Sequence, residues 1–457
     1  MILRGRSVFL AFALGLTVFS WAFAQPPYDL RPLAEFEPQS AVIIGWYDLG
    51  LYGPQADTMW ARAVDAVQDV ALAVIGVAAQ NGIAPIQGFL TSMGIPLDNV
   101  EFYATSTLSG VWVRDYGPEF VYRENGWRVV VEGGYWPSFP QFVADELGVE
   151  HYHAPISMQG GNYMTDGATE VAVSGRYVSN PEFWQQTIRS YFDLPLHIVP
   201  YLVGEGCGHI DMYARFVAPS RVVISQYVDP THNSNMDLAA AEFEQRGFEV
   251  FRVMTPPVVA ADAAGATMDN RSLLHLPPGV DLPEDGVRGV YRTYTNGIQC
   301  NGVYLLPVYS HEYDAQAAAV FQAALPDHKI VPINCNRIIQ FGGALHCTSS
   351  DVQITGLPRP EPLQVCASDE GAELSWPPVM GAALYDIFRR TVVFGYDLHL
   401  DDAVCSTAST VWVDEGGAGS PGTICYQVVA VMANGVRSMM SSRSGRSLFD
   451  LDHTARR

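Results

Sequence analysis

The sequence predicts an α/β domain followed by a small all-β domain. From about residue 30 to 355, short β-branched runs alternate with helical patterns, whereas from Leu363 to about Ser444 only strands and turns are expected. The proline-rich stretch LPRPEP at 357–362 separates the two patterns. Because 457 residues exceed what one hydrophobic core commonly organises, two domains are the expected arrangement.

The first expected element is a secretory signal over residues 1–24. Arg4 and Arg6 precede an apolar run, and Ala22-Phe23-Ala24 places small residues where a signal peptidase cleaves, near Ala24. We therefore expect export to the periplasm or the extracellular space. No later segment reaches the roughly 18 apolar residues that a membrane-spanning helix needs, so no span is expected.

The α/β domain, expected over residues 25–357, begins with a strand and continues with alternating helices and strands. The strands read as AVIIGWY (41–47), VWVR, EFVY and WRVVVE, and the helices lie within 56–80 and at 180–192, 236–247 and 313–326.

Three segments within this domain resemble one another. Those that begin at His151, Leu196 and Lys329 each follow a helix, run as a strand to a proline, cross a polar or glycine-bearing loop and enter another strand. This order indicates a degenerate internal repeat, with chance similarity as the alternative. Units that stack or close around an axis would bring the loops near residues 162, 209 and 347 together.

The all-β domain is expected over residues 358–446. Several strands about ten residues apart, with Asn434-Gly435 as a hairpin turn, are typical of a small β-sandwich. Residues 447–457 are expected to be a loosely ordered tail.

Charge and cysteine content restrict the partners. Lys and Arg total 26 against 48 Asp and Glu, and the net charge of −22 becomes about −24 without Arg4 and Arg6. Such a chain repels nucleic acid and attracts small guanidinium or ammonium ligands, although solubility alone also accounts for the charge. Seven cysteines, an odd number, leave at least one unpaired in an oxidising compartment.

Two polar motifs are weak when taken singly. WVRDYGPEF (112–120) places Arg114 and Asp115 at the end of an expected strand, and QGGNYMTDG (159–167) contains Asn162 among ordinary turn formers. In GCGHIDMYARF (206–216), Cys207, His209 and Asp211 alternate, so on a strand they would share one face. A metal site is the alternative there, but the paired spacing of zinc motifs is missing, and we expect neither metal nor cofactor.

FGGALHCTSS (341–350) places Cys347 after a Gly-Gly loop, where a backbone free to approach a ligand suits a nucleophile. If the stretch is a strand, His346 points to the opposite face, so His209 is the expected partner of Cys347. Guanidinium fits these groups: Asp115 and Asp211 could grip its N–H edges while the thiolate attacks its carbon and histidine transfers protons.

These residues resemble the bacterial, Porphyromonas-type peptidylarginine deiminase and agmatine deiminase family of guanidino-group modifying, or pentein, enzymes. WVRDYGP, QGGN, GHIDMYARF, Asn-Gly before LLPVY, and GGALHCTS follow the family order over about residues 30–355. The resemblance implies a five-bladed α/β propeller with Cys347 as nucleophile, His209 as general acid/base, and Asp115 and Asp211 as guanidinium ligands. Either Asn296 or Asn301 would support the site, and Trp112, Arg114 and Asn162 are further expected substrate contacts.

The expected function is a secreted protein-arginine deiminase that converts peptidylarginine to citrulline, with agmatine deiminase of putrescine biosynthesis as the alternative. Export and a C-terminal module that resembles fibronectin type III favour the first. Members that select a terminal carboxylate use arginines after the first strand pair, yet GGYWPSFPQF (133–142) has no Arg or Lys, which keeps agmatine open. Trp136 and Phe139 there would pack on a substrate or in the core.

Further alternatives are an amidinotransferase, a cysteine hydrolase, and an inactive binding protein whose β-module docks on a surface or partner. The sequence leaves the oligomeric state open.

Overall fold

The computed structural model describes residues 26, 30–123, 125–260 and 289–354, and, between 356 and 446, all but 357, 359, 361, 369–370, 393–402, 415–422, 434–436 and 439–443. The expected signal at 1–24, the Asn434-Gly435 turn and the tail at 447–457 lie outside the described residues. Every helix in the described part of the chain is too short or too polar to cross a lipid bilayer.

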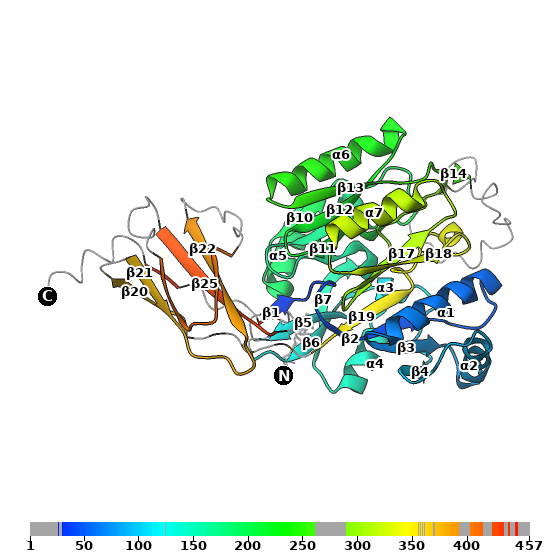
Figure 1. Cartoon of the computed structure of the whole chain (residues 1–457), viewed down its shortest axis with the longest axis horizontal. Helices are drawn as coiled ribbons and strands as arrows, with labels where there is room; N and C mark the ends of the chain where they lie inside the picture. The colour runs from blue at the N-terminus through cyan, green and yellow to red at the C-terminus, as the bar shows by residue number, and fades with distance from the viewer. Residues whose placement is uncertain are drawn as a thin grey trace, which may run out of the picture.

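The chain up to residue 354 has a mixed α/β fold built on five small sheets that repeat one unit (Figure 1). In each sheet, one strand pairs antiparallel with one neighbour and parallel with a strand that follows a helix. In sheet order, the strands are β19 (Ser349–Gln353), β2 (Gln39–Gly45), β3 (Leu72–Val77), β4 (Val100–Ala104); β1 (Leu30–Pro32), β5 (Glu119–Arg123), β6 (Arg128–Gly134), β7 (His151–Met158); β10 (Leu196–Val199), β9 (Val171–Ser174), β8 (Met164–Thr165); β11 (Ala214–Ala218), β12 (Arg221–Gln226), β13 (Glu249–Met254); and β16 (Ile298–Cys300), β17 (Val303–Val308), β18 (Lys329–Asn334). A short pair, β14 (Val259–Ala260) and β15 (Gly289–Val290), accompanies them.

The three segments that look alike in sequence occupy the same place in this unit. Strands β7, β10 and β18 are each the parallel strand after a helix, and each leads into a loop with a 3-10 turn: η2 (Gly160–Asn162), η4 (Ile210–Met212) and η6 (Ile339–Phe341). The loops that contain η2, η4 and η6 therefore follow equivalent strands of the repeated unit.

The helices connect the parallel strands and carry clear start signals. Asn180 and Asp229 accept backbone N–H groups at the first turns of α5 and α6, and proline follows each of these caps. The α-helices are α1 (Pro54–Gln68), α2 (Ile83–Ser92), α3 (Val113–Tyr116), α4 (Ser138–Leu147), α5 (Pro181–Phe192), α6 (Pro230–Gln245) and α7 (Asp314–Ala324), and the remaining 3-10 turns are η1 (Gln80–Gly82) and η3 (Gly175–Tyr177).

Three local expectations are wrong. The helix expected within 56–80 ends at Gln68, because Leu72–Val77 is an apolar run that forms the inner strand β3. Val113–Tyr116, expected to end a strand, is a helical turn. The stretch expected as an alternating strand from Cys207 to Asp211 instead enters the 3-10 turn η4, so its side chains do not follow strand alternation.

The described residues of the C-terminal part form strands and no helix, in two sheets: β20 (Gln364–Ser368), β21 (Gly371–Ser375), β24 (Val411–Asp414); and β23 (Cys405–Thr407), β22 (Leu384–Val392), β25 (Thr423–Val431), β26 (Ser444–Arg446). Leu374 and Trp376 from the first sheet side share one buried cluster with Tyr385, Ile387 and Val428 from the second.

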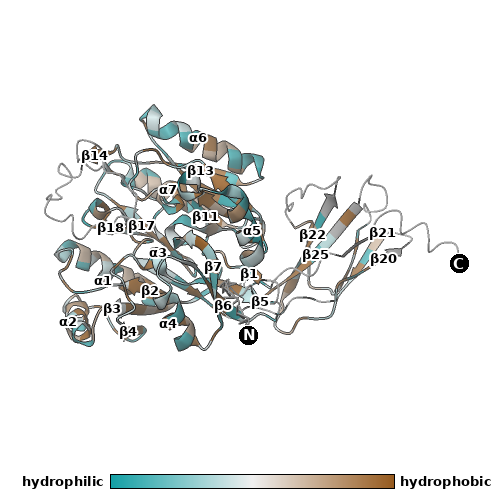
Figure 2. Cartoon of the chain, turned by 180° about the vertical axis from the view of Figure 1, so that it is seen from behind, coloured by the Kyte–Doolittle hydropathy of each residue, from teal (hydrophilic) through white to brown (hydrophobic). Residues whose placement is uncertain are grey.

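The core of the α/β part lies between strands and helices. Strands such as β11 consist mainly of hydrophobic residues, whereas helix α6 carries both hydrophobic and hydrophilic residues (Figure 2). The apolar residues Val42, Ile44 and Ile75 on the inner strands and Met59 and Val64 on α1 are almost fully buried. This packing fixes the strand ends from which the polar loops extend.

Candidate active site

The site is assembled from loops that leave the five repeated units. Asp115 lies on α3 after β4, Gly161 in η2 after β7, and Asp211 in η4 after β10; Asn296 lies between β15 and β16, and Cys347 follows β18. His209 is the residue directly before η4. Residues more than 200 positions apart in the chain thus meet because equivalent loops lie at one end of the repeat.

Cys347 is the buried centre of this group, with 3% of its surface exposed. Asn296 Nδ2 donates to its Sγ over 3.1 Å, and the thiol donates to Asp211 Oδ2 over 3.5 Å. Burial raises the pKa of Cys347 well above its ordinary value, and the charges of Asp211 and Asp115 raise it further. A cation placed between those carboxylates would offset this effect and favour the thiolate.

Cys347 does not lie on a strand; it lies in a turn before β19. Glycine at 343 makes room for it: a Cβ there would lie 2.6 Å from Cys347 Sγ and 2.9 Å from the Trp112 ring. Glycine at 343 is therefore required by the close approach of the thiol and the indole, and Trp112 flanks the site.

His209 is buried beside Asp115, with Nδ1 3.3 Å from Asp115 Oδ1. Burial would lower the pKa of His209, but the charges of Asp115, Asp211 and Glu205 outweigh burial and raise it. Its Nε2 has no hydrogen-bond partner among the described residues. The imidazole is therefore a proton donor or acceptor available to a bound molecule.

Asp211 has one carboxylate oxygen engaged and one free. Oδ2 accepts from Asn296 Nδ2 over 2.9 Å and contacts His346 and Cys347, whereas the buried Oδ1 has no partner among the described residues. A buried acceptor without a donor is costly unless a ligand supplies one. Asp211 Oδ1 is therefore an acceptor available to an N–H donor of a cationic ligand.

Of the two asparagines left open by the sequence, only Asn296 is at the site. Asn301 lies in the turn between β16 and β17, where it donates to the carbonyls of Gln39 and Val70, so the expectation that it contacts substrate is corrected.

Two further expected substrate contacts are structural. Asn162 uses its amide on the backbone of Ser174 and Ile210, which joins η2 to β9 and η4. Arg114 is buried in ion pairs with Asp351 (2.7 Å) and Glu35 (3.4 Å). The Asn162 amide and both terminal nitrogens of Arg114 are thus engaged with the protein, which gives these two side chains a structural role.

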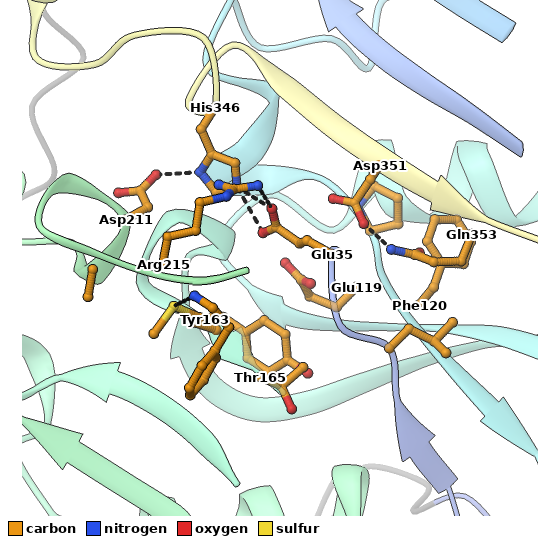
Figure 3. A pocket seen from close by; sticks show the side chains of 15 residues that line it. Glu35, Glu119, Phe120, Tyr163, Thr165, Asp211, Arg215, His346, Asp351 and Gln353 are labelled. Atoms are coloured by element: carbon orange, nitrogen blue, oxygen red, sulfur yellow. Dashed lines mark hydrogen bonds and ion pairs between the residues drawn. The ribbon is translucent and has the colours of Figure 1, made fainter. Parts of the chain in front are cut away.

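The expectation that His346 faces away from the reacting groups needs correction. Because 345–348 form a turn and not a strand, the His346 ring contacts the same Asp211 carboxylate that Cys347 contacts, with Nδ1 2.8 Å from Oδ2. Its neighbours Glu35, Arg215, Glu119 and Asp351 line a small cavity behind the site (Figure 3). Sequence reasoning missed this cluster because Glu35 lies in none of the motifs, and nothing along the chain pairs it with Arg215 or His346.

The arrangement can attack a planar cationic carbon. A thiol, an imidazole with a free nitrogen, and a carboxylate oxygen without a donor converge, while the described residues hold no group of three or more side chains suited to a metal ion. The three groups suit a cysteine nucleophile acting on a cationic substrate held between carboxylates.

The family model described as Porphyromonas-type peptidyl-arginine deiminase matches residues 31–352. The chain belongs to this family, which confirms the family predicted from the motifs. It is a hydrolase of the class that acts on the carbon–nitrogen bonds of linear amidines.

Relatives and solved structures named as agmatine deiminases are similar to this chain in sequence and in fold. A protein of Latilactobacillus sakei named "Putative agmatine deiminase" is 24% identical over 366 residues, covering 70% of this chain and 95% of its own. The agmatine deiminase structures of Enterococcus faecalis and C. jejuni share the fold, with TM-scores of 0.56 and 0.58 at 20% and 17% identity. The two alignments cover 71% of this chain and 95% and 96% of theirs.

Proposed function

We propose that this protein is an agmatine deiminase, which hydrolyses the guanidinium group to a ureido group and ammonia. The observation that carries the proposal is the set of buried, partly unpartnered groups around Cys347: Asp211 Oδ1 and His209 Nε2 both lack a partner among the described residues. A guanidinium group supplies the N–H donors that Asp211 and Asp115 would accept.

In the proposed reaction, the bound guanidinium cation offsets the two carboxylates and favours the Cys347 thiolate. Sulfur forms a bond to the guanidinium carbon, a proton from imidazolium His209 goes to one nitrogen, and the C–N bond breaks to release ammonia. Water then adds to the thiouronium carbon while His209 takes its proton. The added hydroxyl then loses its proton to the released ammonia as the C–S bond breaks, which returns the thiolate and imidazolium His209 and leaves the neutral ureido product and ammonium.

The substrate assignment differs from the first expectation, which put peptidylarginine before agmatine. Several relatives carry the agmatine deiminase name. In addition, residues 133–142 offer no cationic side chain for a substrate carboxylate. Of the two aromatic residues expected there as packing partners, Phe139 is buried in the core, whereas Trp136, at 43% exposure, stays available for contact. Agmatine has no carboxylate, so it needs no such contact.

Peptidylarginine remains the second candidate because the family model carries that description and the chain continues into an all-β part. We propose that the five sheets form a five-bladed propeller over 25–357, that the two C-terminal sheets form a sandwich over 358–446, and that residues 1–24 direct export. The shared buried cluster of the two C-terminal sheets supports the sandwich.

The test is to incubate the protein separately with agmatine, an arginine peptide and free arginine, and to measure ammonia and the ureido product. The proposal predicts the highest kcat/KM with agmatine. A preference for the peptide would make the protein a peptidylarginine deiminase, and turnover only with an added amine acceptor would indicate an amidinotransferase. No ammonia from folded protein with any of the three would overturn deimination.

A further inference from the structure

A chain of three side chains runs behind the nucleophile, from Glu35 through His346 to Asp211 (Figure 3). His346 Nε2 lies 2.8 and 3.0 Å from the two carboxylate oxygens of Glu35, and His346 Nδ1 lies 2.8 Å from Asp211 Oδ2. Only 2% of His346 is exposed, so no water competes freely for these contacts. The histidine next to Cys347 in sequence therefore contacts the same Asp211 oxygen, Oδ2, that the thiol contacts.

Glu35 is itself held in place. Arg215 Nη2 lies 2.5 Å from Glu35 Oε2, and Arg114 Nη1 lies 3.4 Å from Glu35 Oε1. Burial would raise the pKa of Glu35, but Arg114, Arg215 and His346 outweigh it and hold that pKa well below its ordinary value. Glu35 is therefore a fixed anion whose two oxygens face the His346 ring.

The ring in turn limits how the Asp211 carboxylate can rotate. Oδ2 is held on two sides, by His346 Nδ1 and by Asn296 Nδ2. Rotating the Asp211 carboxylate out of this orientation therefore breaks two hydrogen bonds. What remains is Oδ1, buried and without a partner among the described residues. Asn296 supplies a single hydrogen bond to this oxygen, because the other N–H of Nδ2 is directed to Cys347 Sγ.

We propose that His346 is a positioning residue: supported by Glu35, it orients Asp211 so that Oδ1 faces the guanidinium group of the substrate. This inference rests on the proposed deiminase function. It assigns His346 no contact with substrate and no proton transfer in the reaction; His346 acts through Asp211.

Two substitutions of His346 separate its contact with Asp211 from its contact with Glu35. An asparagine amide nitrogen can occupy the place of imidazole Nδ1, so His346→Asn keeps the donor to Asp211. A glutamine amide nitrogen can occupy the place of Nε2, so His346→Gln keeps the contact with Glu35 and loses the one with Asp211. The new side chains are both polar, and neither is much larger than histidine. A loss of activity caused by altered packing alone should therefore appear in both variants.

The control is His197→Gln. His197 is also a buried histidine between two glutamates, with Nδ1 2.9 Å from Glu170 and Nε2 3.0 Å from Glu242, but it packs on Phe243 away from the site. Thermal unfolding of all three variants establishes that they fold. Agmatine kinetics are measured on each, and agmatine binding is measured by calorimetry with each change placed in a Cys347→Ser background.

We expect His346→Gln to lower kcat/KM by roughly 10- to 100-fold, the range found when a supporting partner of a site ligand is removed. Agmatine binding in the Cys347→Ser background should weaken by about tenfold, which corresponds to ~1.4 kcal/mol. His346→Asn should recover most of both, and His197→Gln should match the unaltered protein.

Equal kinetics and binding for His346→Asn and His346→Gln would overturn the inference, because the donor to Asp211 would then not matter. So would a His346→Gln variant that differs from His197→Gln only in its melting temperature. Failure of the proposed function looks different: the unaltered protein would then release no ammonia from any guanidine.

Discussion

Gly161 is the most informative single position at the site, because its missing side chain leaves room for three functional groups. A Cβ at this position would lie 2.6 Å from His209 Nδ1, 2.7 Å from Asp115 Oδ1 and 3.2 Å from Asp211 Oδ2. Ordinary van der Waals contact begins at 3.4 Å, so in Gly161→Ala the imidazole and both carboxylates must retreat. The φ of Gly161 lies outside the left-handed region, so alanine itself is not strained there.

The expected result is a large loss of activity with little loss of stability. A displacement approaching 1 Å in a catalytic geometry costs on the order of 100-fold, which corresponds to ~2.7 kcal/mol of transition-state stabilisation. The assay is kcat/KM for ammonia release from agmatine, together with thermal unfolding. Gly88→Ala is the control, because a Cβ at this exposed helical glycine meets nothing within 4 Å. If Gly161→Ala kept kcat/KM within about twofold of the parent, the close packing of the three groups would not matter and the reasoning would be refuted.

Three further predictions concern the nucleophile and its neighbours. Cys347→Ser should abolish ammonia release and leave the melting curve nearly unchanged, whereas unfolding would show that the thiol is structural. Because burial and then Asp211 and Asp115 raise the pKa of Cys347, iodoacetamide should alkylate the free enzyme slowly at neutral pH and faster as the pH rises; Asp211→Asn removes one of these causes and should speed alkylation at fixed pH, and a rate independent of pH would contradict this. Asn296→Ala should reduce kcat/KM, whereas Asn301→Ala should cost about 1–3 kcal/mol of unfolding free energy for its lost backbone contacts and leave KM for agmatine unchanged; the reverse pattern, measured by kinetics and denaturant unfolding, would refute the assignment of Asn296 to the site.

Sequence reasoning worked where the signal is local. Start signals such as Asn180-Pro181, apolar runs and the repeated strand-to-loop order indicated the α/β fold and the equivalence of β7, β10 and β18. It failed where a short stretch fits both a strand and a turn. The residues around Asp115, Asp211 and Cys347 were expected on strands, and all three lie in helical or other turns. Alternation arguments about which side chain faces where were therefore not valid at the site.

The sequence by itself determined the family and the chemical groups. An ordered set of motifs, an acidic composition and a cysteine behind two glycines are properties of the chain, and they need no coordinates. Only the tertiary structure decided which of those groups meet. In the structure Asn296, and not Asn301, contacts Asp211. Arg114 and Asn162 bond within the protein, and His346 contacts Asp211 instead of facing away from it. The physical reason is that hydrogen bonds act over about 3 Å between loops of different units, and no pattern along one strand records that distance.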